Sequence, residues 1–434
     1  MMVISDNKRE VVYIASRIFL DSATVLSPGA VAVRDGTVVA AGRPREVERS
    51  LSRGFDRKEF PGAAILPGLV NAHTHLQIPR LTIPAGGATA ESSSFVEWIL
   101  GVIAWRSNAP PDEFLLNFET AAAEAISFGT TAVGEISRPD QGIYGSCSLR
   151  ARLFAEGIGF TPEAAGESLA AVEAALARLE ECARESGGLV APGLSPHTLY
   201  TVGPALLGLL GDLAARKGVP ACLHLAESPA EMEFLSTGGG PVATLLYPAV
   251  GRDVSWFRGI GMSIPSYLEK AGLLREGLLL VHNVHLSRGD IGILRQRGAR
   301  FVLCPRSNAA HGNGSPDVTH FVDTGIPFAL GTDSLGSVPD VSVWEEMRAA
   351  RSIYRGSLSD AELCRVLFRA GTGNGAAALG LAGGSLRSGG AADFILADNP
   401  QGDGGAAIIN LVERTKGRNV LMTVVGGSSR FERA

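Results

Sequence analysis

The sequence predicts an α/β fold: a (β/α)₈ TIM barrel with a small β-sandwich domain built from both termini. Three observations lead to this prediction. Through the middle of the 434 residues, short apolar runs alternate with amphipathic helical patterns. The two ends carry strand and hairpin signals instead. Histidines and carboxylates follow several of the apolar runs, and catalytic groups of (β/α)₈ barrels sit at the carboxyl ends of the strands in this way.

The first part of the chain has the pattern of paired strands. Asp35-Gly36 is a dipeptide typical of hairpin turns, and apolar residues flank it on both sides. Near the other end, residues 391–397 and 419–425 have the composition of strands. We therefore expect both ends to share one sheet-rich unit. The predicted composite domain comprises residues 1–65 and 385–434.

Residues 66–384 are predicted to form the (β/α)₈ barrel. The candidate strands are 64–72, 131–136, 151–158, 189–194, 220–225, 278–281, 301–304 and 328–331. The helical patterns between them include 114–127, 169–186, 204–217, 288–297 and 343–354. Two insertions, 77–94 and 228–265, follow the first and fifth strands. We expect them to overhang the active face and to select the substrate.

The composition is that of a globular protein with a large core. Hydrophobic residues make up 45% of the chain, charged residues 19%, and the formal net charge is -5. This balance provides no basic surface for nucleic acid or for a membrane. No apolar run reaches the roughly 18 residues that span a bilayer, and the N-terminus lacks a signal-peptide core. A cytoplasmic location is therefore expected. The five cysteines are scattered without a CxxC pair, which argues against disulfides and against a thiolate zinc site.

The most informative residues are His73 and His75, which end the first apolar run of the barrel. Side chains two positions apart on an extended segment point to the same side, so both imidazoles can bind one ion. His224 and Asp333 each end another apolar run. A lone histidine is more often structural, but this set favours a metal site. Three imidazoles and a carboxylate suit Zn²⁺, and Fe²⁺ or Mn²⁺ would accept the same ligands.

Three residues are predicted to be catalytic, namely Glu227, His282 and the metal ligand Asp333. Glu227 follows His224 by three positions, where its carboxylate can take a proton from the metal-activated water and pass it to the substrate. The alternative for Glu227 is an exposed loop glutamate. His282 ends another strand, where it can orient the attacking water or stabilise developing charge. Asp333 is expected to accept a proton as well as to bind the metal.

Four other residues are candidates for substrate binding. His197 and Arg306 follow the fourth and seventh strands, Glu135 ends the second, and Trp98 lies beyond the first insertion. Each has a structural alternative. The histidine can serve the fold, the arginine can form a salt bridge, the glutamate can shape the mouth of the site, and the tryptophan can belong to the core.

Together, these motifs resemble the amidohydrolase superfamily, in its cytosine/adenosine-deaminase-like and chlorohydrolase-like branch. The resemblance spans nearly the whole chain and is carried by residues 67–75, 195–197, 224–227, 281–286 and 330–334. It implies a single divalent metal on His73, His75, His224 and Asp333. It also implies a proton shuttle at Glu227, a water-assisting role for His282, and substrate contact by His197. Two-metal relatives carry a lysine at the end of the fourth strand, and this chain has none there.

Two segments bear on the substrate. Adenosine-type relatives carry a glutamate shortly after the tryptophan of the first loop, which grips the ribose, whereas residues 103–108 contain no carboxylate. The run 303–308, together with 224–228, is similar to aminodeoxyfutalosine deaminases.

The resemblance implies hydrolytic deamination of an amino-substituted N-heterocycle, such as an amino-purine nucleoside or aminodeoxyfutalosine, with release of ammonia. The same site would serve another C–N or C–Cl bond, as in triazine chlorohydrolases and cyclic amidases, so that alternative stays open. A non-catalytic scaffold would be expected to lack ligands, and all four are present. The expected partner is a small-molecule substrate, and relatives favour a homodimer.

Overall fold

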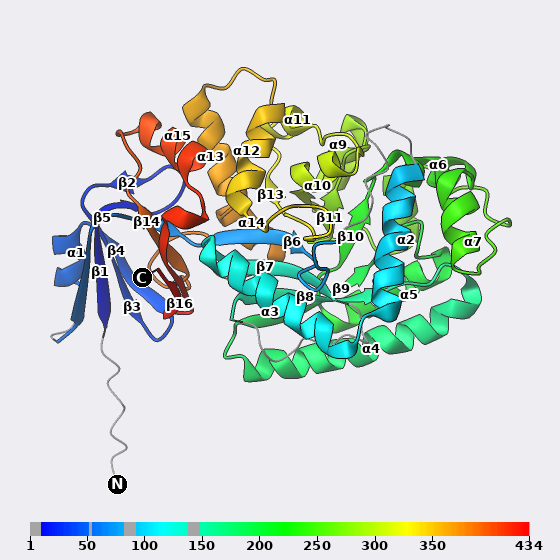
Figure 1. Ribbon diagram of the computed structural model, residues 1–434, viewed down its shortest axis with the longest axis horizontal. Coiled ribbons are helices and arrows are strands. Elements are labelled where there is room, and N and C mark those ends of the chain that lie inside the picture. The colour runs from blue at the N-terminus through cyan, green and yellow to red at the C-terminus, as the bar shows by residue number, and fades with distance from the viewer. Residues whose placement is uncertain (1–9, 52–53, 82–92, 138–147, 434) are drawn as a thin grey trace, which may run out of the picture.

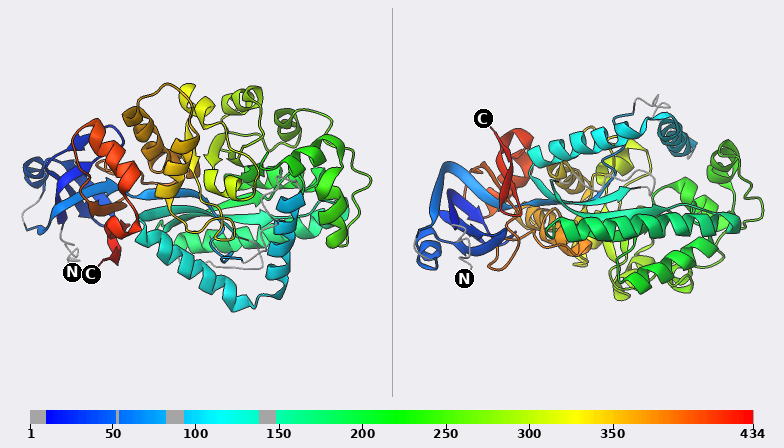
Figure 2. Two further views of the ribbon diagram at one scale, coloured as in Figure 1. Left: turned by 45° about the horizontal axis from the view of Figure 1, so that its top comes forward. Right: turned by 90° about the horizontal axis from the view of Figure 1, so that it is seen from below.

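The computed structural model describes residues 10–51, 54–81, 93–137 and 148–433. Strands from both chain ends gather at one end of the molecule, and parallel strands with helices around them make up the rest (Figure 1). The blue and red strands stay together in both views of Figure 2. Residues 82–92 of the first predicted insertion, and Cys147, lie outside the described residues.

The two termini form one sheet of eight strands, ordered β16-β15-β14-β5-β1-β3-β4, with β2 paired to β1. The strands are β1 Val11–Phe19, β2 Val25–Leu26, β3 Gly29–Arg34, β4 Thr37–Gly42, β5 Asp56–Pro67, β14 Phe394–Asp398, β15 Val420–Val425 and β16 Ser428–Glu432. β5 joins the two halves, because it pairs parallel to β1 and antiparallel to β14. The predicted hairpin at Asp35-Gly36 is confirmed as the antiparallel pair β3 and β4. Helix α1 (Pro44–Arg49) packs Val47 against this sheet.

The middle of the chain contains two parallel sheets of four strands, ordered β6-β7-β8-β9 and β10-β11-β12-β13. The strands are β6 Leu69–Thr74, β7 Thr130–Ser137, β8 Arg150–Gly157, β9 Val190–Pro196, β10 Cys222–Leu225, β11 Leu279–His282, β12 Arg300–Leu303 and β13 Phe328–Leu330. Isolated parallel bridges connect the sheets at both edges. Leu194 pairs with Ala221 on one side, and Thr74 pairs with Asp333 on the other.

Helices flank these parallel strands (Figure 2). Besides α1, the described helices are α2 Ser93–Asn108, α3 Pro111–Ser127, α4 Pro162–Glu185, α5 Pro204–Lys217, α6 Pro229–Thr237, the π-helix η1 Val242–Leu246, α7 Tyr247–Ala249, α8 Ile264–Lys270, α9 Arg288–Gln296, α10 Pro305–Ala310, α11 Val318–Asp323, α12 Val343–Ile353, α13 Asp360–Ala370, α14 Gly373–Leu379, α15 Gly405–Arg414 and the 3₁₀-helix η2 Gly417–Asn419. The alternation of strands and helices confirms the predicted α/β class. Within the described residues, no helix combines the length and the apolar character that a membrane crossing needs.

One predicted strand is divided in the structure. Residues 64–72 were expected to form a single strand, but β5 ends at Pro67 in the terminal sheet and β6 begins at Leu69. Gly68 makes the transition. A Cβ atom at this position would lie 2.0 Å from Thr131 Oγ1, so only glycine allows the backbone to pass so close to β7.

A buried ion pair ties the parallel strands to the terminal sheet. Arg150, the first residue of β8, donates from Nε to Asp393 Oδ2 at 2.6 Å and from Nη2 to Oδ1 at 3.1 Å. Asp393 is fully buried, and its Oδ1 also accepts from the Gly426 backbone N–H at 2.7 Å. Every acceptor atom of the carboxylate therefore has a donor, which compensates for the burial of the charge.

We predict that Asp393→Ala lowers the free energy of unfolding by about 3–5 kcal/mol, because it leaves the buried Arg150 charge without its partner. Urea unfolding followed by circular dichroism measures the change. Glu173→Ala is the matched control, since it removes an exposed ion pair with Arg216, and it should have little effect. Equal effects of the two variants would contradict the assigned role.

Candidate metal and active site

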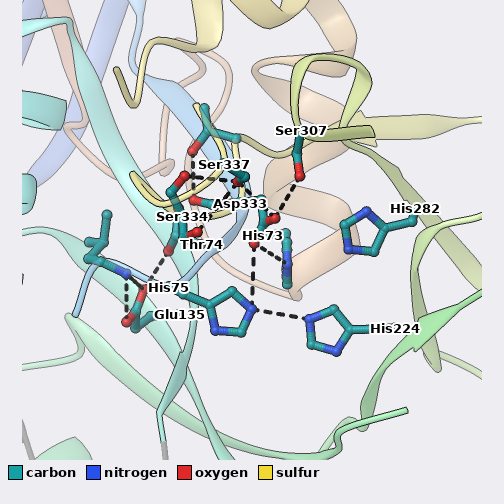
Figure 3. A network of polar contacts seen from close by, with 12 residues as sticks. His73, Thr74, His75, Glu135, His224, His282, Ser307, Asp333, Ser334 and Ser337 are labelled. Atoms are coloured by element: carbon teal, nitrogen blue, oxygen red, sulfur yellow. Dashed lines mark hydrogen bonds and ion pairs between the residues drawn. The ribbon is translucent and has the colours of Figure 1, made fainter. Parts of the chain in front are cut away.

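The ends of several parallel strands bring four histidines and an aspartate together (Figure 3). His73 lies at the end of β6 and His75 follows it, His224 lies in β10, His282 ends β11, and Asp333 follows β13. All five side chains are buried, with at most 7% of any residue exposed. Their rings and carboxylate point toward one another in Figure 3. The structure thus groups the residues that the sequence assigned to the metal site.

His73, His75 and His224 can place three nitrogen atoms around one point. Their ligand atoms all lie within 4.8 Å of one another, and His75 Nε2 and His224 Nε2 are 3.1 Å apart. Within the described part of the chain, neither ring nitrogen of His73 has a hydrogen-bond partner. Buried imidazole nitrogens without partners are the donors that a zinc ion takes. Asp333 Oδ1 lies 3.6 Å from His73 Nε2 and 3.7 Å from His75 Nε2, beside the three histidines.

Neighbouring groups fix the orientation of these side chains. His224 Nδ1 donates to the backbone oxygen of His197 at 2.7 Å, which leaves Nε2 facing His75. Asp333 Oδ2 accepts hydrogen bonds from the hydroxyls of Ser307 at 2.7 Å and Ser337 at 3.0 Å, so Oδ1 is the atom that faces the histidines. Hydrogen bonds of this kind hold metal ligands in one geometry.

Burial controls the charges in the site. Burial and the neighbouring His73 lower the pKa of His75 to about 3, and burial together with surrounding histidines lowers the pKa of His224 well below its usual value. Burial likewise lowers the pKa of His282 to about 3. Burial alone would raise the pKa of Asp333, but contacts with His73 and His75 outweigh it and hold that pKa well below the usual range. Burial therefore favours neutral imidazoles at His75, His224 and His282 and an ionised Asp333, the forms in which such groups bind a metal.

Glu227 faces this group from the turn after β10. Its Oε2 lies 3.7 Å from His282 Nε2, and only 6% of the residue is exposed. Burial, with the charges of Asp333 and Glu231 nearby, raises the pKa of Glu227 well above its usual value. A raised pKa makes the carboxylate a stronger base, which suits a group that takes up a proton and then returns it. The structure excludes the alternative of an exposed loop glutamate.

Glu231 holds the turn that carries Glu227, and sequence analysis missed it. Its carboxylate accepts from the backbone N–H groups of Ala226 at 3.0 Å and Glu227 at 2.7 Å. Ser228 begins α6 as its N-cap and accepts from the Glu231 backbone N–H. The order Ser-x-x-Glu is the pattern of a helix start, so it could have drawn attention to Glu231, although not to its role behind Glu227.

Backbone strain also gathers at the strand ends. Five non-glycine residues of the described chain have a positive φ. Asp35 lies in the hairpin turn, and the other four are Ala226, His282, Asn283 and Asp333. Such conformations cost of order 1–3 kcal/mol each and persist at functional sites where the surrounding structure enforces them.

A cavity of about 610 Å³ opens onto this group, and His75, His224, Glu227, His282 and Asp333 all line it. His197 and Trp98, predicted to bind substrate, line it as well. The Trp98 indole N–H donates to the Gly336 backbone oxygen at 3.2 Å, which fixes the ring at the wall. Glu156, Arg106 and Arg252 are further charged residues of the cavity wall that sequence analysis did not select.

Comparison with known proteins decides the family. The model of the amidohydrolase family matches residues 64–429, most of the chain. The chain belongs to the amidohydrolase family. This confirms the resemblance inferred from the sequence motifs, and it makes the protein a hydrolase that acts on carbon–nitrogen bonds.

Individual members of the family give more detail. An aminodeoxyfutalosine deaminase of Deinococcus radiodurans is 33% identical over 342 residues, which cover 76% of this chain and 77% of that protein. A 5-methylthioadenosine/S-adenosylhomocysteine deaminase of Natronomonas pharaonis is 27% identical, covering 90% of this chain and 85% of the relative. The structure of Helicobacter pylori aminofutalosine deaminase in complex with methylthio-coformycin matches 97% of this chain and 100% of that one, with a TM-score of 0.80 and 22% identity. A Xanthomonas campestris adenosine deaminase solved with bound zinc matches 98% of this amidohydrolase and 93% of that chain, with a TM-score of 0.74 and 22% identity.

Arg306 and Glu135 do not line the cavity of this amidohydrolase, although the sequence suggested that they bind substrate. Arg306 lies in α10, where Nη1 donates to Asp340 Oδ1 at 2.9 Å. Arg306 therefore forms a salt bridge, which was the alternative to substrate binding. Glu135 is fully buried at the end of β7. It accepts from the Thr74 hydroxyl at 2.6 Å and from the Leu76 backbone N–H at 3.0 Å, the two neighbours of His75.

We predict that Glu135→Ala weakens zinc binding by about 10–100-fold, because it removes the group that holds the backbone on both sides of His75. Competition with a chelator of known affinity measures this change. Glu135→Gln is the graded control, since it keeps one acceptor oxygen and should lose less. Unchanged zinc affinity in Glu135→Ala would show that His75 is held by other contacts.

Proposed function

We propose that this amidohydrolase is a metal-dependent hydrolytic deaminase of an amino-substituted N-heterocycle and releases ammonia. The proposed substrates are amino-purine nucleosides, including aminodeoxyfutalosine. The observation that carries the proposal is the grouping of three buried histidine nitrogens beside a cavity that Glu227 and His282 line. The names of the most similar relatives support the same chemistry.

His73, His75 and His224 would hold one divalent metal ion, with Asp333 as a fourth ligand. Three nitrogens and one carboxylate oxygen suit Zn²⁺, and Fe²⁺ or Mn²⁺ would accept the same set. When bound, such an ion lowers the pKa of water from about 15.7 to about 7 and so supplies a nucleophile at neutral pH.

Side chains of the protein then transfer the protons and orient the water. Water adds to the ring carbon that bears the amino group, while Glu227 takes a proton from the water and gives it to the adjacent ring nitrogen. His282, whose Nε2 lies beside Glu227, orients the water and stabilises charge as the carbon becomes tetrahedral. Asp333 accepts the second proton of the water, and a proton returns to the amine. The C–N bond breaks, ammonia leaves, and a carbonyl remains.

Several finer features of the molecule belong to the same proposal. We infer that the two parallel sheets close into a (β/α)₈ barrel at the bridges Leu194–Ala221 and Thr74–Asp333. The barrel would span residues 66–384, and the terminal sheet would fold as a β-sandwich from residues 1–65 and 385–434. A homodimer and a cytoplasmic location remain predictions from the sequence.

The direct test is an assay of the zinc-loaded protein against a panel of substrates. Adenosine, 5′-methylthioadenosine and aminodeoxyfutalosine should release ammonia. Chloro-triazines and cyclic amides form the second arm, assayed for chloride and for ring opening. Structural neighbours of this chain include an atrazine chlorohydrolase, so release of chloride without ammonia would replace deamination by dechlorination.

We predict that Glu227→Gln keeps its zinc but loses turnover by at least about 10²–10⁴-fold, because the amide cannot carry the proton. Ammonia release and metal content are measured on the same preparation. His224→Ala is the contrasting variant and should lose both zinc and activity. A near-normal rate in Glu227→Gln would remove this residue from the mechanism.

A further inference from the structure

We infer that Asn308 is a positioning residue for the deamination, because its side-chain oxygen fixes an N–H of His282 at Nδ1 and leaves Nε2 as the atom that meets the water. The inference rests on the proposed function, in which His282 orients the attacking water. It deepens that proposal by naming the ring nitrogen that acts and the residue that selects it. Sequence analysis gave Asn308 no role of its own.

Asn308 contacts the nitrogen of His282 that is not beside Glu227. Asn308 Oδ1 lies 2.9 Å from His282 Nδ1. The other ring nitrogen, Nε2, lies 3.7 Å from Glu227 Oε2. His282 lines the cavity, whereas Asn308 is fully buried and does not line it. The two nitrogens of one ring therefore have different surroundings, an amide of the protein interior on one side and the proton-carrying carboxyl group on the other.

The chemistry of the amide oxygen assigns the hydrogen. An amide oxygen can only accept a hydrogen bond, so the Nδ1 atom that it contacts must carry hydrogen. In a neutral imidazole, the other nitrogen then presents a lone pair. In a charged imidazole, both nitrogens carry hydrogen, and the one at Nε2 is free to leave while Asn308 holds the other. In either state of His282, Nε2 is therefore the atom that takes up or gives up a proton.

The backbone around Asn308 holds its side chain beside His282. The Asn308 backbone N–H donates to the Cys304 oxygen at 3.1 Å, and its carbonyl oxygen accepts from the Asn313 N–H at 3.0 Å. Within the described residues, the side-chain atom Nδ2 has no hydrogen-bond partner. A turned amide would place Nδ2 against His282 and reverse the position of the hydrogen on the ring. The two amide orientations therefore differ in a way that can be measured.

The short helix α10 orients a metal ligand as well. Ser307, the neighbour of Asn308, donates to Asp333 Oδ2 at 2.7 Å, and Figure 3 shows this bond. Glu346 of α12 accepts from a backbone N–H at the start of α10 at 3.2 Å and so holds that end of the helix. Two adjacent residues thus hold Asp333 and His282. A metal ligand and the group that orients the water are therefore kept in one geometry by a single element.

The test observes the two nitrogens of His282 directly. The zinc-loaded protein is labelled with ¹⁵N in its histidine rings, and NMR chemical shifts distinguish a nitrogen that bears hydrogen from one that has a lone pair. The His282 signals are assigned by their loss in His282→Gln. We expect Nδ1 to bear hydrogen at every pH at which the protein stays folded. A lone pair at Nδ1 in the wild type would overturn the inference.

Variants test the part of Asn308. Asn308→Leu removes the acceptor, so hydrogen should move in part from Nδ1 to Nε2. We expect kcat for adenosine to fall by about 10–100-fold, the range for loss of one partner of a buried hydrogen bond. KM should change little, because the substrate still binds. Asn308→Asp keeps an acceptor oxygen, so it should retain the Nδ1 hydrogen and lose less of kcat.

Asn374→Leu is the matched control. It also removes an amide contact, from Asn374 Nδ2 to the Phe328 backbone oxygen at 3.0 Å, but it lies in α14 and does not line the cavity. With zinc content intact, Asn308→Leu must lose more of kcat than this control does. An equal loss, or an Asn308→Leu protein that keeps the hydrogen on His282 Nδ1, would overturn the inference, because it would show a purely structural role.

Failure of the proposed function is distinguishable from failure of the inference. If wild type releases no ammonia from any amino-purine nucleoside, the function is wrong, whereas the NMR spectra still show whether Asn308 fixes the hydrogen of His282. If Asn308→Leu does not fold, the spectra of wild type and Asn308→Asp decide. Both must show hydrogen on Nδ1, and a lone pair there in either protein would overturn the inference.

Discussion

The active site depends on the contact between the first and the last parallel strands. Asp333 donates its backbone N–H to the His73 backbone oxygen at 3.1 Å, across 260 positions of the chain. Asn71 and Thr332 reinforce this contact, with hydrogen bonds in both directions of 2.7 and 3.0 Å. A Cβ atom at Gly331 would lie 2.7 Å from His73 Cβ, so the two backbones approach this closely only because glycine stands there. Without this contact, the histidine pair of β6 and the aspartate after β13 would not share one site.

Burial of these groups sets their charge states, and it also costs free energy of folding. A histidine in water takes up a proton near pH 6.5, whereas burial favours the neutral forms of His75 and His224, which can donate electron pairs to a metal. Burial also penalises the charge of Glu227. Positive φ angles at His282 and Asp333 add backbone strain. The surrounding strands must offset these costs, and the fully buried residues of β10 and β11 show how well packed that support is.

The sequence predicted the strands and the histidines at their ends, and it missed residues whose contacts depend on the folded structure. All eight strands of the two parallel sheets were located, and the three histidines that the structure groups were selected, because strand ends and a His-x-His pair are local signals. Glu231 was missed because its role arises from a turn whose shape the sequence does not show, and Glu156 was missed because it meets Arg106 from a segment far away in the chain. Arg306 follows β12 and Glu135 lies near the end of β7, yet their side chains contact Asp340 and Thr74 and do not line the cavity. A position near a strand end identifies candidate site residues, and the contacts of each side chain then show whether it faces the cavity.

The second insertion contributes to the cavity wall and is itself well packed. Residues 228–265 were expected to overhang the site, and Tyr247 and Arg252 do line the cavity. Yet this segment has a core of its own, in which Phe234, Tyr247 and Phe257 pack with Val96 of α2. The Tyr247 hydroxyl donates to the Tyr200 backbone oxygen at 2.6 Å and so anchors the segment beside β9. Since apolar contacts join the insertion to α2, which also carries Arg106, the two segments form one wall of the cavity. The position of Arg106 in that wall therefore depends on the packing of the insertion against α2.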